Sequence, residues 1–195
     1  PPPPRYTNYA GLRHHLHTHL RPQHRVLHVG SGNSPLAEEL HGDGFRDVTN
    51  VDISASVIET MLLRTAALAP PMSWQVMDVR AMEFGDEAFD FVLDKGCLDT
   101  VLAGEAGEKD AGKFLEQVAR ILRPGGIYMC ISCGVPNERL PQLSNQDYSW
   151  DVATTPVPKP VNSEETAKRQ NSPDEDPVSS YWMYVCKTGG DEDEG

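Results

Sequence analysis

Two glycines separated by one residue follow a short apolar run, in the segment Val29-Gly30-Ser31-Gly32-Asn33-Ser34. Glycine allows a tight bend and lets the backbone approach a ligand closely, because no Cβ stands in the way. The helix expected over residues 36–41 would direct its free amide groups at the charged or polar part of that ligand. A plain tight turn would explain the two glycines equally well, so a binding loop needs support from other positions.

Three more polar motifs each follow a predicted strand. Asp52 comes about twenty residues after the glycine loop, where a carboxylate can accept both ribose hydroxyl protons. Asp78 can take a hydrogen bond from an adenine amino group, while the backbone amide of Val79 faces a ring nitrogen. The motif Asp94-Lys95-Gly96-Cys97-Leu98-Asp99 puts a charged pair at the mouth of a fourth strand. Alone, each could be a helix cap, a turn cap or an exposed salt bridge of little energetic weight.

An alternation of strands and helices must position these motifs. We expect strands over residues 25–29, 47–52, 74–78, 89–94, 127–132 and 181–186, and helices over 36–41, after Ser54, and over 113–122. This order predicts a doubly wound, mostly parallel α/β sheet covered on both faces, in three α/β/α layers. Ligands of such sheets bind beyond the carboxyl ends of the strands, so the four motifs are expected to meet there.

A nicotinamide-dependent enzyme is the natural competitor among ligand-binding folds of this class. Its fingerprint requires a third glycine at position 35, where this chain has Pro35. Proline suits a helix start but not a close approach to a pyrophosphate. S-adenosylmethionine carries no pyrophosphate, so the pattern favours a methyltransferase.

The segments 27–34, 51–54, 77–80 and 89–99 resemble the class I, seven-strand S-adenosylmethionine-dependent methyltransferases, in particular the group containing the elongation factor 1-alpha lysine methyltransferases. The resemblance implies a Rossmann-like seven-stranded sheet, S-adenosyl-L-methionine as cofactor and a protein lysine as methyl acceptor. The expected cofactor contacts are Tyr9, Arg13, Gly30, Gly32, Asn33, Asp52, Ile53, Asp78, Val79 and Asp94. The expected catalytic residues are Asp94, Lys95 and Asp99, with Tyr9 as a further candidate at the mouth of the site.

Two positions depart from the pattern of that group. Cys97 replaces the threonine of the hallmark motif, and His28 stands where class I enzymes usually carry an acidic residue. A neutral imidazole at that place would hold the ammonium of the cofactor less well than a carboxylate.

Length and composition fit one globular domain of 195 residues, with 38% hydrophobic and 24% charged residues. We expect an N-terminal lid segment and helix over 1–24, the methyltransferase domain over 25–190 with a flexible excursion at about 152–177, and an acidic tail over 191–195. The net charge of −12 argues against nucleic acid as the main partner. No stretch approaches the length of a membrane span.

The cysteines and histidines indicate the compartment and the absence of a metal site. The Cys130-x-x-Cys133 pair falls in a predicted buried strand and lacks the second ligand pair of a zinc site, so we expect core cysteines in a reducing cytoplasm, a redox pair being the alternative. Five histidines between positions 14 and 24 lack partners at ligand spacing, so no metal is expected.

The leading hypothesis is a monomeric protein-lysine methyltransferase acting on a protein such as elongation factor 1-alpha. A small-molecule methyltransferase, with residues 135–177 enclosing its substrate, is the first alternative. A non-catalytic methyltransferase-fold module that binds partners through its acidic surface is the second.

Overall fold

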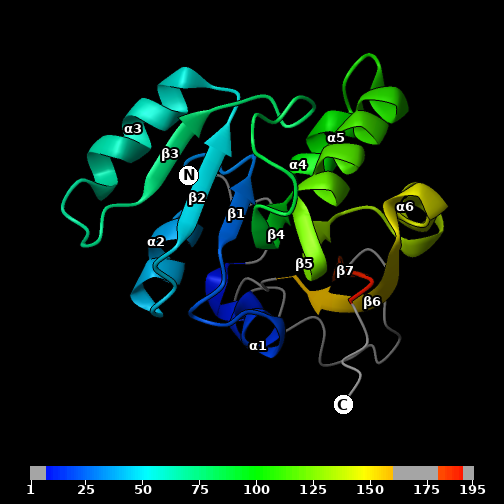
Figure 1. Cartoon of the computed structure of the whole chain (residues 1–195), viewed down its shortest axis with the longest axis horizontal. Helices are drawn as coiled ribbons and strands as arrows, with labels where there is room; N and C mark the ends of the chain where they lie inside the picture. Colours follow the sequence, from blue (N-terminus) through cyan, green and yellow to red (C-terminus); the bar gives the residue numbers. More distant parts are fainter. Residues whose placement is uncertain (1–7, 160–179, 191–195) are drawn as a thin grey trace, which may run out of the picture.

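The computed structural model describes residues 8–159 and 180–190. These form a seven-stranded sheet in the order β3-β2-β1-β4-β5-β7-β6 (Figure 1). The strands are β1 Val26–Val29, β2 Val48–Asp52, β3 Ser73–Val76, β4 Phe89–Lys95, β5 Leu122–Ser132, β6 Trp150–Pro158 and β7 Ser180–Thr188. The first five are parallel and β7 runs antiparallel to both of its neighbours. The expected doubly wound, mostly parallel sheet is confirmed.

Helices cover both faces of the sheet. They are α1 Tyr9–His19, α2 Leu36–Gly42, α3 Ala55–Thr65, α4 Cys97–Leu102, α5 Gly107–Ile121 and α6 Pro136–Leu143, with a short 3-10 helix η1 at Gln146–Tyr148. Buried residues of α1, α2 and α3 belong to one apolar cluster, and those of α4, α5 and α6 to the other. Successive residues of a strand point to opposite faces, so Phe91 and Leu93 of β4 join the first cluster while Val92 joins the second.

Helix starts follow the expected capping residues with small shifts. The Ser54 hydroxyl accepts a hydrogen bond from the amide of Val57 and caps α3, as its position predicts. At α2, Pro35 is the cap residue and not the first helical residue. The helix expected over 113–122 already begins at Gly107, because Glu108 and Asp110 favour its first turn.

The largest correction concerns the end of the sheet. Residues 152–158, predicted to belong to a flexible excursion, form most of β6, which pairs with β7 from Trp150↔Thr188 to Pro158↔Ser180. This strand occupies the edge of the sheet, where prolines such as Pro156 and Pro158 are tolerated because one side of the strand has no neighbour to accept a backbone hydrogen bond. Residues 160–179 and the acidic tail 191–195 lie outside the described residues.

Two absences apply to the described ranges. No helix within residues 8–159 and 180–190 is both long and apolar enough to cross a membrane. All four cysteines fall in these ranges, and none forms a disulfide there; three are buried, whereas Cys133 is exposed, so it is not the core residue that the strand pattern predicts.

A buried hydrogen-bond chain docks α3 against β3. The indole N–H of Trp74 donates to the Thr65 hydroxyl at 3.0 Å, and this hydroxyl donates to the carbonyl of Met61 at 2.8 Å. The contact orients the two strands whose ends carry Asp52 and Asp78.

We predict that Thr65→Val lowers the free energy of unfolding by about 1–3 kcal/mol, because the shape is kept while a buried indole N–H loses its acceptor. Urea denaturation measures the change. Thr65→Ser keeps the hydroxyl and is the matched control, expected to retain most of the stability. Equal stability of the valine and serine variants would contradict the prediction.

Candidate active site

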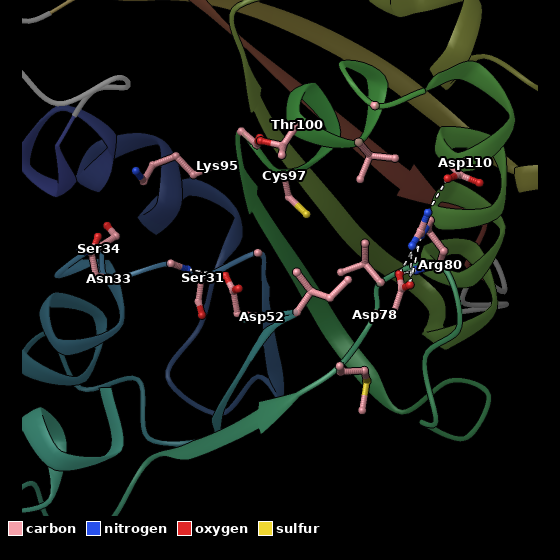
Figure 2. Close-up of a pocket in the computed structure, with 18 of the residues that line it drawn as sticks. Ser31, Asn33, Ser34, Asp52, Asp78, Arg80, Lys95, Cys97, Thr100 and Asp110 are labelled. Atoms are coloured by element: carbon pink, nitrogen blue, oxygen red, sulfur yellow. Dashed lines mark hydrogen bonds and ion pairs between the residues drawn. The ribbon is translucent and has the colours of Figure 1, made fainter. Parts of the chain in front are cut away.

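A pocket of about 860 Å³ opens at the carboxyl ends of β1 to β4, under the segment that joins α4 to α5 (Figure 2). It gathers eight of the residues that the sequence indicates: Gly30, Gly32, Asn33, Asp52, Ile53, Asp78, Val79 and Lys95. Tyr9, Arg13, Asp94 and Asp99 do not line it. Each group has a local reason for its place.

The glycine loop is shaped by backbone conformation and by α4. Gly30 and Gly32 have φ of +55° and +56°, in the left-handed region that favours glycine. A Cβ on Gly30 would lie 2.6 Å from the Sγ of Cys97, whereas a Cβ on Gly32 would meet nothing within 4 Å. Gly30 is therefore needed for packing as well as for the turn. The residue that departs from the hallmark motif, Cys97, is the one that packs against it.

Asp52 joins the loop to the start of α3. One carboxylate oxygen accepts from the amide of Gly32 at 2.8 Å and the other from the amide of Ser54 at 2.9 Å. A carboxylate has about four acceptor sites, so about two remain on the pocket side. That capacity fits two neighbouring hydroxyl groups. Ile53, the next residue, exposes 66% of its surface and offers an apolar face for a flat ring.

Asp78 is held by an arginine that the sequence analysis missed. The guanidinium of Arg80 pairs with Asp78 at 2.7 Å and also pairs with Asp110, and all three residues line the pocket. The amide of Arg80 donates to the same carboxylate at 2.9 Å, which closes a tight turn after β3. The hydrogen bonds from Arg80 hold the pKa of Asp78 below its usual range. The one available signal was an Asp two residues before a cation, which is weak.

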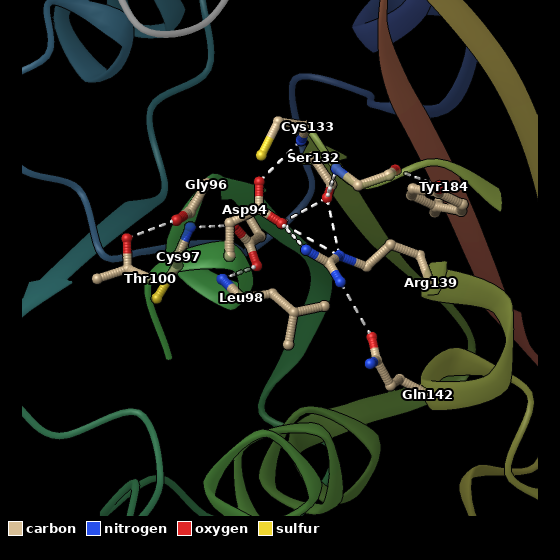
Figure 3. Close-up of polar contacts among 12 residues, drawn as sticks. Asp94, Gly96, Cys97, Leu98, Thr100, Ser132, Cys133, Arg139, Gln142 and Tyr184 are labelled. Atoms are coloured by element: carbon tan, nitrogen blue, oxygen red, sulfur yellow. Dashed lines mark hydrogen bonds and ion pairs between the residues drawn. The ribbon is translucent and has the colours of Figure 1, made fainter. Parts of the chain in front are cut away.

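Asp94 lies beneath the pocket, fully buried. Its carboxylate accepts from the amides of Cys97 at 2.7 Å and Leu98 at 3.0 Å (Figure 3). It also accepts from the Tyr128 hydroxyl at 2.8 Å. Burial raises its pKa to about 6. Asp94 is not among the residues that line the pocket, because period-2 alternation along β4 turns its side chain under α4, which it caps. Its contact with the cofactor or the acceptor stays a prediction.

Asp99 is committed to the connection after β5. It pairs with Arg139 at 2.7 Å, both side chains being about nine-tenths buried, and it accepts from the amide of Cys133 at 2.8 Å (Figure 3). Asp99 does not line the pocket in this structure, and its catalytic role stays a prediction. Lys95 does line the pocket, and burial lowers its pKa from the ordinary value.

Tyr9 and Arg13 lie away from the pocket. The Tyr9 hydroxyl donates to Asp43, and the Nε of Arg13 donates to the same carboxylate at 2.7 Å. Asp43 directly follows α2, which leads away from the glycine loop, and Figure 1 shows α1 far from the carboxyl ends of β2 and β3. This structure does not bring Tyr9 and Arg13 to the pocket, and their contact with the cofactor stays a prediction. The buried residues Leu12 and Leu16 pack α1 into the apolar cluster that also contains the buried residues of α2 and α3.

His28 is an interior residue. Its Nδ1 lies 3.1 Å from the Asn50 Oδ1, and the Asn50 amide donates to the carbonyl of Ser73 at 3.1 Å, so the pair links β1, β2 and β3. Burial lowers the pKa of His28 to about 4, and the imidazole is neutral at pH 7. It is not among the residues that line the pocket.

The pocket fits S-adenosylmethionine on the chemistry of its donors and acceptors. The Ser31 hydroxyl in the glycine loop is buried and has no hydrogen-bond partner among the described residues. An unsatisfied buried group costs about 1–3 kcal/mol, so a polar ligand group beside it would be favoured. Together with the spare acceptors of Asp52 and the apolar face of Ile53, this site suits a nucleoside that carries a polar chain.

Comparisons with known proteins agree with this geometry. A family model described as a methyltransferase domain matches residues 27–130, more than half of the chain. The chain is 44% identical over 129 residues to the "eEF1A lysine and N-terminal methyltransferase" of Bos taurus, covering 65% of this chain and 18% of the relative. It is 37% identical over 158 residues to the "EEF1A lysine methyltransferase 4" of Mus musculus, covering 77% of this chain and 62% of the relative. It thus spans less than two thirds of either relative.

The fold also matches solved structures. A SAM-dependent methyltransferase of Methanosarcina mazei superposes with a TM-score of 0.71 at 14% identity, covering 90% of this chain and 97% of that one. At this identity the likeness establishes the fold, a Rossmann-like methyltransferase sheet.

The buried carboxyl of Asp94 predicts a pH dependence of stability. Its folded pKa of about 6 lies above the ordinary value of 3.8, so the folded state binds this proton more tightly than the unfolded state does. Its contribution is therefore fully present below pH 3.8 and is lost as the pH rises to about 6, a loss of about 3 kcal/mol.

Urea denaturation of the wild type and Asp94→Asn between pH 3.5 and 7 measures this, since groups common to both proteins cancel in the difference. The stability of the wild type minus that of the variant should fall across this range. A difference that is constant or that grows with pH would contradict the assignment.

Proposed function

The chain belongs to the methyltransferase domain family, and we propose that it transfers a methyl group from S-adenosylmethionine to a lysine side chain of a protein. The observation that carries the proposal is the convergence of the glycine loop, Asp52 and the Asp78–Val79 turn on one pocket. The printed names of the relatives, both lysine methyltransferases of eEF1A, support the acceptor class.

Different residues of the pocket would bind different parts of the cofactor. The spare acceptor sites of Asp52 would take the two ribose hydroxyls, and Ile53 would lie against the adenine ring. Asp78 would accept from the adenine amino group, with the amide of Val79 facing a ring nitrogen. The glycine loop, including Asn33, would enclose the methionine end, where the Ser31 hydroxyl offers a hydrogen bond.

S-adenosylmethionine supplies an electrophilic methyl group on a positively charged sulfur. The chain must therefore position a neutral acceptor amine in line with it and keep competing water away. Lys95 lines the same pocket, and its positive charge would disfavour the protonated form of an incoming lysine. The proton of that lysine would leave through the open side of the pocket, because neither Asp94 nor Asp99 lines the pocket.

Elongation factor 1-alpha is the proposed acceptor, from the names of the relatives. The net charge of −12 would attract a basic surface on such a substrate. A cytoplasmic location is part of the proposal; cysteines that form no disulfide in the described residues are consistent with a reducing compartment. We further propose that the protein acts as a monomer.

We predict that Asp52→Asn weakens the binding of S-adenosylmethionine at least about tenfold, or about 1.4 kcal/mol. The amide supplies one acceptor oxygen where the carboxylate supplies two, and its NH₂ opposes a backbone N–H. Isothermal titration calorimetry measures Kd. Asp86→Asn is the matched control, because Asp86 is an exposed acid that pairs with Arg120 outside the pocket. Equal Kd values for wild type and Asp52→Asn would refute the role of Asp52.

The acceptor class is tested by incubating the protein with methyl-labelled S-adenosylmethionine and purified elongation factor 1-alpha, and separately with the small-molecule fraction of a lysate. We expect label on a lysine of the factor, mapped by mass spectrometry, and less label with Asp52→Asn at a cofactor concentration near the Kd of the wild type. Label in small molecules alone would establish the first alternative. Absence of cofactor binding would establish a non-catalytic module.

A further inference from the structure

We propose that Arg80 is a positioning residue that sets the selectivity of the pocket for a 6-aminopurine, by fixing the orientation of the Asp78 carboxylate. This inference rests on the proposed function, in which Asp78 receives the amino group of the cofactor's adenine. It assigns to Arg80 a role that neither the glycine loop nor Asp52 can supply, since both serve other parts of the ligand.

The contacts of Arg80 lock Asp78 from one side. The Nε of Arg80 donates to the Asp78 Oδ1 at 2.9 Å, and Nη2 donates to Oδ2 at 2.7 Å. The backbone amide of Arg80 donates to Oδ1 at 2.9 Å. Two parallel bonds from a planar guanidinium fix the plane of a carboxylate as well as its position. A lysine at position 80 would supply charge without that plane.

The guanidinium is itself anchored at its other end. Nη1 of Arg80 donates to Asp110 in the first turn of α5, and Asp110 also pairs with Lys113 at 3.1 Å. Helix α5 is held in the core by Phe114 and Leu115, which are 0% and 1% exposed. Arg80 thus connects the turn after β3 to a firmly packed helix across the pocket (Figure 2).

These bonds leave Asp78 with little acceptor capacity. Three N–H donors of Arg80 face this carboxylate: the backbone amide, Nη2, and Nε, which is shared between Oδ1 at 2.9 Å and Oδ2 at 3.1 Å. Three donors use about three of the roughly four acceptor sites of a carboxylate, so about one remains. A purine amino group can donate to that site. A 6-oxo group would place its own lone pairs against a carboxylate that cannot rotate away, and polar mismatches of this kind are penalised strongly in binding sites.

The ion pairs of Arg80 contribute little to overall stability. Arg80 is 37% exposed and Asp78 35%, so solvent and salt screen their attraction. Substituting Arg80 should therefore change ligand selectivity while the unfolding midpoint stays close to that of the wild type. That separation distinguishes a positioning role from a merely structural one.

The test is isothermal titration calorimetry of the full chain with two ligands, S-adenosylhomocysteine and S-inosylhomocysteine, which differ at position 6 of the purine and in the hydrogen that N1 carries in the 6-oxo compound. Any discrimination by the Val79 amide at N1 is common to the wild type and the Arg80 variants, so a change in selectivity between these proteins reports on Asp78. We expect the wild type to bind the amino compound more tightly. The selectivity is the Kd of S-inosylhomocysteine divided by the Kd of S-adenosylhomocysteine. In Arg80→Gln and Arg80→Lys this ratio should fall about tenfold or more, mainly through weaker binding of the amino compound. Asp110→Asn should lower the ratio by a smaller factor, because it loosens Arg80 and leaves Asp78 unchanged.

Arg25→Gln is the matched control, because Arg25 is similarly exposed, pairs with Asp90 at 3.1 Å and is not a residue of the pocket. It should leave both Kd values unchanged. An unchanged ratio in the Arg80 variants, or an equal loss for both ligands, would overturn the inference while the proposed function stands. Failure of the wild type to bind S-adenosylhomocysteine would overturn both.

Discussion

The buried carboxylate of Asp94 fixes the relation between the sheet and the pocket above it. It receives two amides from the first turn of α4 and the hydroxyl of Tyr128 on β5, so one side chain ties β4, β5 and α4 together. The start of α4 then places Cys97 against Gly30, which leaves no room for a Cβ in the glycine loop. The loop in turn donates an amide to Asp52. The shape of the cofactor pocket therefore follows from a group that does not line it.

The sequence was sufficient for the parts of the site that depend on topology. Gly30, Asp52 and Asp78 each end a parallel strand, and the ends of parallel strands meet at one edge, so their convergence was predictable without coordinates. Asp94 also ends a strand, but its side chain faces the helix layer shared with Val92. The alternation along β4 contained that information, whereas the charged pair with Lys95 drew attention to the mouth of the strand.

Other features depend on contacts that no local pattern encodes. The apolar residues of α1 predict that it docks on the sheet, but they do not predict where. The structure places α1 beside the end of α2, so Tyr9 and Arg13 donate hydrogen bonds to Asp43. The edge strand β6 has mostly exposed side chains and two prolines, so neither burial nor periodicity marks it. Arg80 was missed because its partner Asp110 is thirty residues away on α5.

Four carboxylates in or under the site already have donors that hold their orientation. Asp52 has two backbone amides, Asp78 has Arg80, Asp94 has two amides and a phenol, and Asp99 has Arg139. A site whose polar groups are oriented beforehand needs little reorganisation when a ligand enters. The lone pairs that remain, about two on Asp52 and about one on Asp78, then define which hydrogen-bond donors a ligand must present. Selectivity therefore depends on the carboxylate lone pairs that no protein donor occupies. For this reason a residue such as Arg80 can control ligand recognition by orienting a carboxylate, without contacting the ligand itself.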